Sequence, residues 1–248
     1  MTSGGATLLP AFKGIIERGA LLGIVRIGVF GGTFNPIHFG HLHLARNLQG
    51  LFSLSQIHFV VATMPPHKPL EDLIPFTHRY AMVSLAVAGA PSFIPSLIEL
   101  EPQASSFSVD TMHKFSRSLR RDRHILYFIA GSDSLLEVQS WRESETLLTA
   151  YNFVFVMRPG SAPADPGEIL PEKAVARVRD LTGLRRAQMR RRIAEESADE
   201  SRIYLVDIAA PNVSATQIRQ LASSGKSIHH LVPGPVREYI RKLHLYGA

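Results

Sequence analysis

The sequence predicts an α/β fold in which a Rossmann-like parallel sheet is flanked by helices. Short, nearly continuous apolar runs rich in β-branched residues recur along the 248-residue chain, as expected for strands buried on both faces. Segments with helical periodicity separate these runs, and glycine or proline follows most of them. Such alternating elements form parallel sheets through right-handed crossovers, with ligand sites at the carboxyl ends of the strands.

Five segments are predicted to be buried strands, and a sixth to be an edge strand. The five are 24–30 (IVRIGVF), 57–62 (IHFVVA), 124–130 (HILYFIA), 153–157 (FVFVM) and 203–208 (IYLVDI). The weaker segment 93–97 contains Pro95, which has no N–H to donate and is therefore confined to an edge or an irregular stretch. Helices are predicted at 41–51, 75–88, 109–119, 143–150, 214–223 and 232–243.

The rhythm of strands and helices predicts one domain over residues 24–248. Residues 161–202 depart from it, because they open with prolines and small residues and continue into a stretch rich in Arg, Glu and Ala. We expect a polar surface insertion with a helix there. Residues 1–23 are interpreted as an N-terminal extension, at most partly ordered.

Composition excludes several classes of protein. Apolar residues make up 45% of the chain and charged residues 19%, which is typical of a globular domain. The sequence has no cysteine, which excludes disulfides, thiolate nucleophiles and Cys-type zinc sites and is compatible with a reducing, cytoplasmic location. No run approaches the ~18 consecutive apolar residues of a membrane span, so we expect no membrane partner.

The net charge of +6 and the pI of about 9.8 suit a polyanionic partner such as a nucleotide. Much of the charge lies in arginine clusters at 117–123 and 185–192. The ordinary interpretation of such clusters is a solvated helix face, so we do not expect a nucleic-acid partner. The sequence leaves a homo-oligomer open.

The segment 28–42 (GVFGGTFNPIHFGHL) combines the features of a phosphate-binding site. A buried strand ends at Gly31 and Gly32, which allow a ligand to approach the backbone closely. His38 and His41 then enter a helix, whose N-terminus presents N–H groups to an anion, and their spacing places them on one side of it. Neither GxGxxG nor GxxxxGK[ST] fits this segment.

Two other interpretations of this segment stay open from the residues alone. His38 and His41, with His43 nearby, could form a metal pair, but no acidic or cysteine partner lies at metal-site spacing. We therefore predict no protein ligand for a metal. Alternatively, the polar residues merely cap the helix.

The stretch GGTFNPIHFGH resembles the signature of the nucleotidyltransferase superfamily, whose HxGH motif binds the phosphates of a nucleoside triphosphate. Three further segments are similar to motifs of bacterial nicotinate-nucleotide adenylyltransferases: 64–68 (MPPHK), 131–134 (GSDS) leading into 141–143 (WRE), and 213–219 (VSATQIR), the last resembling ISSTxIR. Together they resemble that family over residues 26–246. The resemblance implies the nucleotidyltransferase fold.

The resemblance also implies two neighbouring sites, one for ATP and one for nicotinate mononucleotide. The residues implied to bind ATP are Gly31, Gly32, Thr33, Phe34, His38, Gly40, His41, Gly131, Asp133, Arg158, Ser214, Thr216 and Arg219. The residues implied to bind the second substrate are Asn35, His67, Lys68, Phe107, Ser108 and Trp141.

Several of these residues have ordinary structural interpretations from residue type alone. Ser214 and Asp133 could each cap a helix N-terminus. Trp141, the single tryptophan, could pack in the core instead of stacking on a ligand, and His67 and Lys68 could be exposed loop residues.

The implied reaction transfers the adenylyl group of ATP to nicotinate mononucleotide and releases pyrophosphate. The attacking 5′-phosphate is already an anion, so the protein need only position the reactants and cancel developing charge. The implied catalytic residues are His41, His38, Lys68 and Arg219, with His41 at the α-phosphate. Mg²⁺ is the implied cofactor, bound mainly through phosphate oxygens and water.

Three residues depart from the family pattern. Asn35 stands where many members have Asp, Phe107 replaces the Tyr of Ser-Tyr-Thr, and Ala215 replaces the second Ser of ISSTxIR. Two alternatives to the implied function remain. One is an adenylyltransferase for nicotinamide mononucleotide or another phosphate monoester, and the other is a non-catalytic module that binds nucleotides or nucleic acid.

Overall fold

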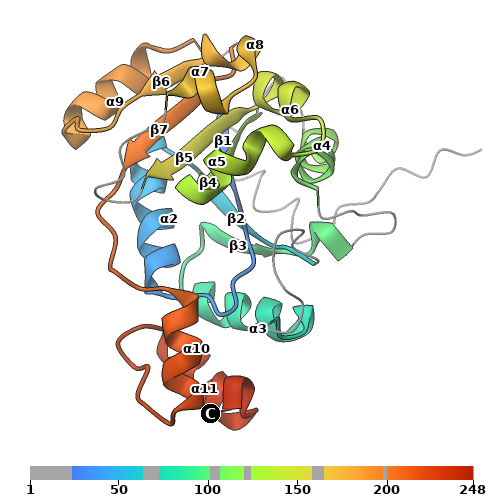
Figure 1. Cartoon of the computed structure of the whole chain (residues 1–248), viewed down its shortest axis with the longest axis vertical. Coiled ribbons are helices and arrows are strands. Elements are labelled where there is room, and N and C mark those ends of the chain that lie inside the picture. The colour runs from blue at the N-terminus through green and yellow to red at the C-terminus, as the bar shows by residue number, and fades with distance from the viewer. Residues whose placement is uncertain are drawn as a thin grey trace, which may run out of the picture.

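A computed structural model describes residues 24–63, 73–100, 107–119, 124–157, 165–197 and 200–247. A seven-stranded sheet with the order β3-β2-β1-β4-β5-β7-β6 forms its centre (Figure 1). Every neighbouring pair is parallel. The predicted α/β fold with a parallel sheet is therefore confirmed. The extension 1–23 lies outside the described residues.

All strands of the sheet except β6 match the predicted strand segments to within a few residues. Their bounds are β1 Val25–Gly32, β2 Gln56–Val61, β3 Phe93–Ser96, β4 His124–Gly131, β5 Asn152–Met157, β6 Val178–Asp180 and β7 Ile203–Asp207. All six residues of β2 and of β5 are buried. β3, which contains Pro95, lies at one edge of the sheet as predicted, because proline cannot donate to a second neighbour.

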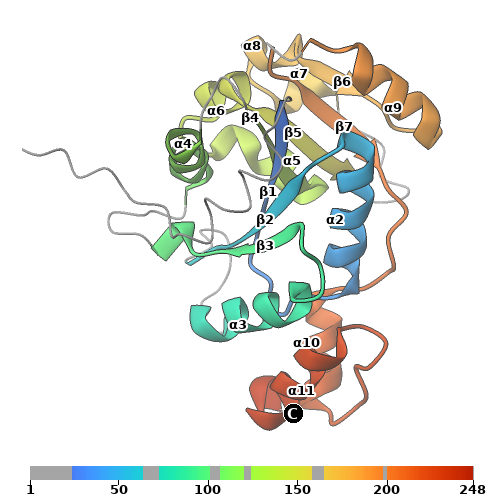
Figure 2. The ribbon, with the colours of Figure 1, turned by 180° about the vertical axis from the view of Figure 1, so that it is seen from behind.

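Helices cover both faces of the sheet. The core between one face and its helices draws residues from α2 Phe39–Phe52, α3 Phe76–Val87, α9 Arg186–Glu195, α10 Ala215–Ser223 and α11 Gly234–Lys242. The core on the other face draws on α4 Ser108–Ser118, α5 Ser132–Glu137, α6 Ser144–Ala150 and α8 Glu172–Val175, and Ile169 of α7 Pro166–Ile169 packs against it. The views from front and back show helices on both faces of the sheet, with α10 and α11 below it and α11 beside α3 (Figures 1 and 2).

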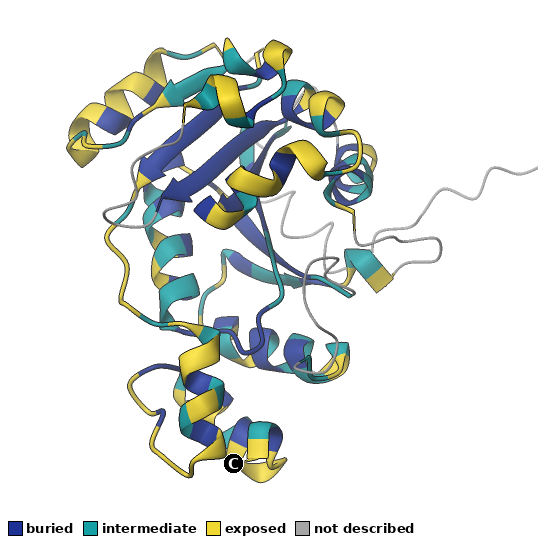
Figure 3. Cartoon of the chain, in the orientation of Figure 1, coloured by how far each residue is buried: buried dark blue, intermediate teal, exposed yellow. Residues whose placement is uncertain are grey.

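Burial follows the alternation of side chains along the central strands. In β1, Val29 belongs to one core and Phe30 to the other. The central strands are thus largely buried, while the outer faces of the helices are exposed (Figure 3). None of the described helices is long and apolar enough to span a membrane.

The segment 161–202 contributes more than the polar surface helix that we expected. Its helix α9 carries several exposed arginines, and two of them donate to α2: Arg186 to Asn47, and Arg190 to the carbonyl of Gly50 at 2.8 Å. The same segment also adds β6 to the sheet beyond β7. The three-residue β6 (VRD) has no apolar run, so hydrophobic pattern alone does not reveal it.

One buried side chain, Arg79 of α3, joins the carboxyl ends of β1 and β2. Its exposed fraction is 0%, and its guanidinium donates four hydrogen bonds to backbone carbonyls. The acceptors are Thr33 (2.9 Å), Ala62 (2.7 Å), Thr63 (3.2 Å) and Ile74 (3.0 Å). Burial lowers the pKa of Arg79, and the nearby Tyr246 and Glu99 oppose that shift.

We predict that Arg79→Met lowers the free energy of unfolding by about 3 kcal/mol or more, because it leaves several buried carbonyls without donors. Urea unfolding measures the change. The matched control is Arg191→Met, in which an arginine whose side chain is 83% exposed loses only an i,i+4 pair with Glu195. That variant should stay within about 0.5 kcal/mol of the wild type. Equal losses in the two variants would contradict the role of Arg79.

Candidate functional site

β1 and β4 are neighbours in the centre of the sheet, and the order in which strands are added to the sheet reverses between them. From β1 the sheet grows through β2 to β3 on one side, and from β4 it grows through β5 and β7 on the other. In open parallel sheets a crevice forms at this position, outside the carboxyl ends of the strands. Here β1 ends at Gly31 and Gly32, and β4 ends at Gly131.

The loop after β1 leads the chain into α2. Phe34 has a positive φ of 48°, and its buried ring packs edge-on against the ring of His41, with 5.0 Å between centroids. The Asn35–Pro36 peptide bond is cis. Phe34, predicted to bind ATP, is thus a core residue that supports the loop from beneath.

His38 and His41 lie against each other at the start of α2, as their spacing predicted. Their ring centroids are 3.7 Å apart, with an angle of 31° between the planes. The backbone N–H of His38, the residue before the helix, donates to Nδ1 of His41 at 3.3 Å. Because Nδ1 accepts, the neutral ring of His41 carries its proton on Nε2 and can donate from there.

Gly40 is required by the ring of His38. A Cβ at position 40 would lie 2.9 Å from Nδ1 and 3.0 Å from Cε1 of that ring. The Gly40 of HxGH therefore allows the two histidines to pack together at the helix start.

The environment of His38 favours its neutral form. Its exposed fraction is 7%, and burial lowers its pKa from about 6.5 to about 4. Its Nδ1 is buried and has no hydrogen-bond partner in the described part of the chain. Such unsatisfied buried atoms are rare in proteins and need a specific explanation, such as a site that a ligand completes.

A cleft of about 570 Å³ brings several of the predicted ATP-binding residues together. His38, Gly40, His41, Gly131 and Asp133 line it. Its other walls come from the end of β5 and from the chain between β7 and α10, and are lined by Val156, Met157, Ile208, Ala210, Pro211, Asn212 and Val213. Gly131, not Asp133, is the N-cap residue of α5, so the exposed Asp133 is not needed for capping.

The motif at 213–219 both begins a helix and reaches the loop after β1. Ser214 caps α10, because its side chain accepts from the backbone N–H of Gln217 at 3.1 Å. Arg219 donates to the carbonyl of Asn35 at 3.1 Å. Thr216 and Arg219 line a further open cleft of about 630 Å³ together with the side chain of Tyr246.

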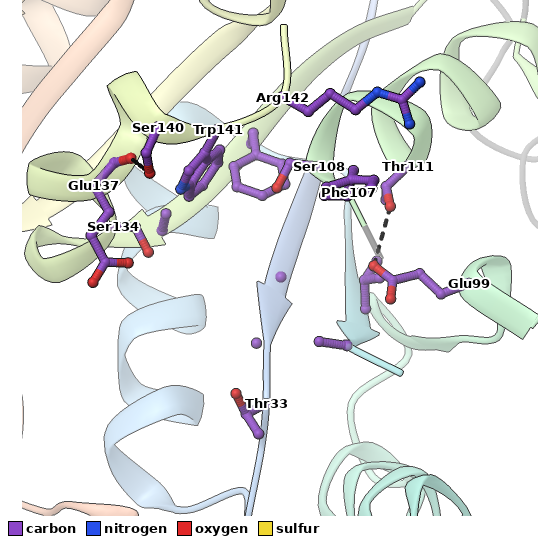
Figure 4. A pocket seen from close by; sticks show the side chains of 16 residues that line it. Thr33, Glu99, Phe107, Ser108, Thr111, Ser134, Glu137, Ser140, Trp141 and Arg142 are labelled. Carbon is purple, nitrogen blue, oxygen red and sulfur yellow. Dashed lines mark hydrogen bonds between the residues drawn. The ribbon is translucent and has the colours of Figure 1, made fainter. Parts of the chain in front are cut away.

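Another cavity, of about 290 Å³, lies at the ends of β1, β2 and β4; we call it the Trp141 cavity. Its floor is formed by Gly31, Gly32 and Thr33. Figure 4 shows Trp141 and Glu137 on one wall and Thr111 and Glu99 on the facing wall. Phe107 and Ser108, which are predicted to bind the second substrate, also line this cavity. Of the six residues predicted to bind that substrate, the lining thus contains Phe107, Ser108 and Trp141 but not Asn35, His67 or Lys68.

Trp141 packs against the core and also lines the cavity, so core packing does not exclude a role in stacking on a ligand. Its ring packs edge-on against Phe128 of the core at 5.9 Å, and its remaining surface lines the cavity. Such a ring, fixed on one side and open on the other, can stack on an aromatic ligand.

Several lining residues were not identified from the sequence. Glu99 accepts hydrogen bonds from the backbone N–H of Thr63 (3.0 Å) and from the hydroxyl of Thr111 (3.2 Å), which joins β2 to α4 across the cavity. The guanidinium of Arg142 lies 5.3 Å from the centroid of the Phe107 ring. The motif WRE contains Arg142 and so offered a signal, whereas Glu99 stood outside every recognised motif.

Three predicted site residues lie outside the described residues, namely His67, Lys68 and Arg158. Within the described ranges, no group of three or more His, Cys, Asp or Glu side chains is placed to hold a metal ion.

The Cytidylyltransferase-like family model matches residues 29–221. This chain thus belongs to the class of nucleotidyltransferases that the parallel sheet and the HxGH site define. Two curated relatives carry the name "Probable nicotinate-nucleotide adenylyltransferase". The relative from Geobacter metallireducens is 40% identical over 224 residues, and the match covers 90% of this chain and 98% of the relative. The relative from Geotalea uraniireducens is 37% identical over 223 residues, and the match covers 90% of this chain and 99% of the relative.

Within that class, the chain belongs to the nicotinate-nucleotide adenylyltransferase family, a family of enzymes. A solved structure supports the fold. The Plasmodium falciparum nicotinic acid mononucleotide adenylyltransferase complexed with NaAD is 18% identical, covers 90% of this chain and 98% of its own, and aligns with a TM-score of 0.64.

The buried histidines predict how stability depends on pH. Burial holds the pKa of His38, and that of His58 on β2, at about 4 in the folded chain, whereas an unfolded chain takes up protons near pH 6.5. The unfolded state therefore binds more protons as the pH falls from 6.5 toward 4. The free energy of unfolding should fall over this window, by up to about 2–4 kcal/mol for each histidine.

Urea unfolding at a series of pH values measures this dependence. His38→Asn should show a smaller fall between pH 6.5 and 4 than the wild type does. An unchanged fall in that variant would mean that burial does not lower the pKa of His38 in the folded chain.

Proposed function

We propose that the protein transfers the adenylyl group of ATP to nicotinate mononucleotide, forming nicotinate adenine dinucleotide and pyrophosphate, a step of NAD biosynthesis. The relatives at 37–40% identity support this assignment of substrates. So does the fold shared with enzymes whose structures hold NaAD and, in a second Plasmodium falciparum complex, APC.

The observation that carries the proposal is the adjacency of two different cavities at the carboxyl edge of the sheet. Ala130 and Gly131, consecutive residues at the end of β4, line one cavity each. One cavity contains the histidine pair, and the other contains the aromatic side chain of Trp141. Two mononucleotides bound side by side in this way would bring an attacking phosphate to an α-phosphate, and their joining would give a dinucleotide.

We assign the reactive centre to the histidine pair. The 5′-phosphate of nicotinate mononucleotide attacks the α-phosphorus of ATP, the bond to the bridging oxygen breaks, and pyrophosphate leaves. The Nε2–H of His41 would donate to an α-phosphate oxygen as charge develops on it. His38 supports the ring of His41, while Arg219 and Lys68 share the charge of the remaining phosphates.

We assign the pyridine ring of nicotinate mononucleotide to the Trp141 cavity, where it would stack on the indole. The ATP site would take the adenosine against Gly131 and Asp133, whose carboxylate can accept from ribose hydroxyls. The roles of Ser214, Thr216 and Arg158 in binding ATP, and of Asn35 and His67 in binding the second substrate, remain predictions.

We further propose Mg²⁺ as the cofactor. The described side chains offer no cluster that would bind it alone, so phosphate oxygens and water would supply most of its ligands. When bound, the ion would neutralise phosphate charge. The cytoplasmic location and a homo-oligomeric state also stay predictions.

His41→Ala should lower kcat by about 10²-fold or more, because it removes one donor to the charge that develops in the transition state. Steady-state assays of pyrophosphate release measure the change, and circular dichroism checks that the variant folds. The control is His43→Ala, which removes an exposed histidine two positions further along α2 and should keep wild-type turnover. A folded His41→Ala variant with normal kcat would exclude the assigned role.

Pyrophosphate release from ATP with nicotinate mononucleotide, compared with nicotinamide mononucleotide, tests the function itself. We expect kcat/KM to favour the acid by at least about tenfold, since hydrogen bonds to a charged group are worth roughly 1.5–3 kcal/mol. A ratio near or below one would favour the nicotinamide alternative. If neither substrate gives pyrophosphate and the protein binds nucleic acid with an affinity that falls steeply as salt is added, a nucleic-acid-binding module would be favoured.

A further inference from the structure

Residues near the end of the sequence form hydrogen bonds with the loop between β1 and α2 and with the start of α2. Arg219 of α10 donates to the carbonyl of Asn35, and the hydroxyl of Tyr246 donates to Oδ1 of the same residue at 2.9 Å. The backbone N–H of Phe39, at the start of α2, donates to the carbonyl of Leu231 at 2.9 Å. Three hydrogen bonds from residues 219–246 thus reach Asn35 and Phe39, which lie on either side of His38.

The backbone around Tyr246 is shaped to bring its ring inward. Tyr246 lies in η4 Leu245–Gly247 with a φ of 63°, and His244 before it has a φ of 48°. Residues other than glycine rarely adopt this left-handed conformation, and where they do, the surrounding structure must enforce it. Leu245, buried in the core between them, anchors the turn.

The hydroxyl of Tyr246 is also set in a particular electrostatic environment. Burial raises its pKa, and the neighbouring guanidinium groups of Arg219 and Arg79 oppose the shift. The phenol therefore stays protonated and keeps its hydrogen for Asn35, which is itself only 6% exposed. Asn35 lies three residues before His38, so the bond fixes the loop close to the histidine pair.

We infer that Tyr246 is a positioning residue for adenylyl transfer: through Asn35 it sets the loop that holds His38 and His41 in their stacked geometry. The inference rests on the proposed function for its kinetic consequence, but its structural consequence is independent of substrate. The phosphate-binding histidines are thus positioned from both ends of the sequence.

The test compares Tyr246→Phe with Tyr239→Phe. Each variant loses one hydroxyl, and both come from the same group of C-terminal elements. The hydroxyl of Tyr239 on α11 is hydrogen-bonded to Nδ1 of His78 on α3 at 3.0 Å, so this variant reports the loss of a tyrosine hydroxyl that bonds to α3 and not to Asn35.

The first measurement is hydrogen exchange of the backbone amides of His38 and Phe39, which needs no substrate. We expect both amides to exchange about tenfold faster in Tyr246→Phe than in the wild type, and at the wild-type rate in Tyr239→Phe. Unchanged exchange in Tyr246→Phe, or equal acceleration in the two variants, would overturn the inference even if the chain catalysed no transfer.

The second measurement is turnover. In Tyr246→Phe, kcat should fall about three- to tenfold, the effect of one neutral hydrogen bond, while both KM values change little. In Tyr239→Phe, kcat should stay at the wild-type level.

A double-mutant cycle with Asn35→Ala then identifies the acceptor. Because the hydroxyl has no partner once Asn35 is truncated, the double variant should lose no more kcat than Asn35→Ala alone. Losses that multiply would show that Tyr246 acts elsewhere and would overturn the inference. Absence of turnover in the wild type would refute the proposed function, whereas the exchange measurement would still decide the role of Tyr246.

Discussion

The hydrogen bonds of the buried Arg79 guanidinium are the interaction on which the structure of the carboxyl edge of the sheet depends. Parallel strands end with carbonyls that no neighbouring strand satisfies, and buried carbonyls without donors are costly. Arg79 supplies rigid, permanently charged donors to the carbonyls of Thr33, Ala62 and Thr63, where β1 and β2 leave the sheet. The loops that follow these strands therefore start from fixed points, and the Trp141 cavity, which Thr33 and Ala62 line, has a fixed floor.

The free-energy cost of burying this charge is offset by the groups around it. Its four hydrogen bonds satisfy much of the guanidinium, and Glu99 contributes an opposing charge while it links Thr63 to α4. The same carboxylate lines the Trp141 cavity. One hydrogen-bond network thus connects α3, the end of β2, α4 and the cavity wall. A substitution of any residue in this network would therefore alter the wall of the Trp141 cavity.

The fold could be predicted from the sequence because hydrophobic runs directly report strands buried on both faces. The strand β6 could not, since its three residues VRD have no apolar pattern and their pairing depends on β7 being present. The histidine pair could be predicted from spacing at a helix start. Arg79, Glu99 and Tyr246 could not. Apart from the bond of Arg79 to Ile74, their contacts join residues 12 to 211 positions apart, which no local pattern records.

The three departures from the family pattern are each compatible with the contacts that the structure shows. At position 35 the contact to Tyr246 needs an oxygen acceptor, which Asn and Asp both provide, and the amide avoids burying a charge beside the core. Ala215 lies in the first turn of α10, where the preceding Ser214 already supplies the cap.

At position 107 the structure shows a contact made by the aromatic ring, and that contact does not require a hydroxyl. The guanidinium of Arg142 lies over the Phe107 ring, 5.3 Å from its centroid, and cation–π attraction acts through the ring face of Phe as it does through that of Tyr. Arg142 is also within 3.7 Å of carboxylate oxygens of Asp110 and Glu143, so the ring orients a side chain that is attracted from several directions. The loss of the phenol hydroxyl therefore leaves the wall of the Trp141 cavity intact.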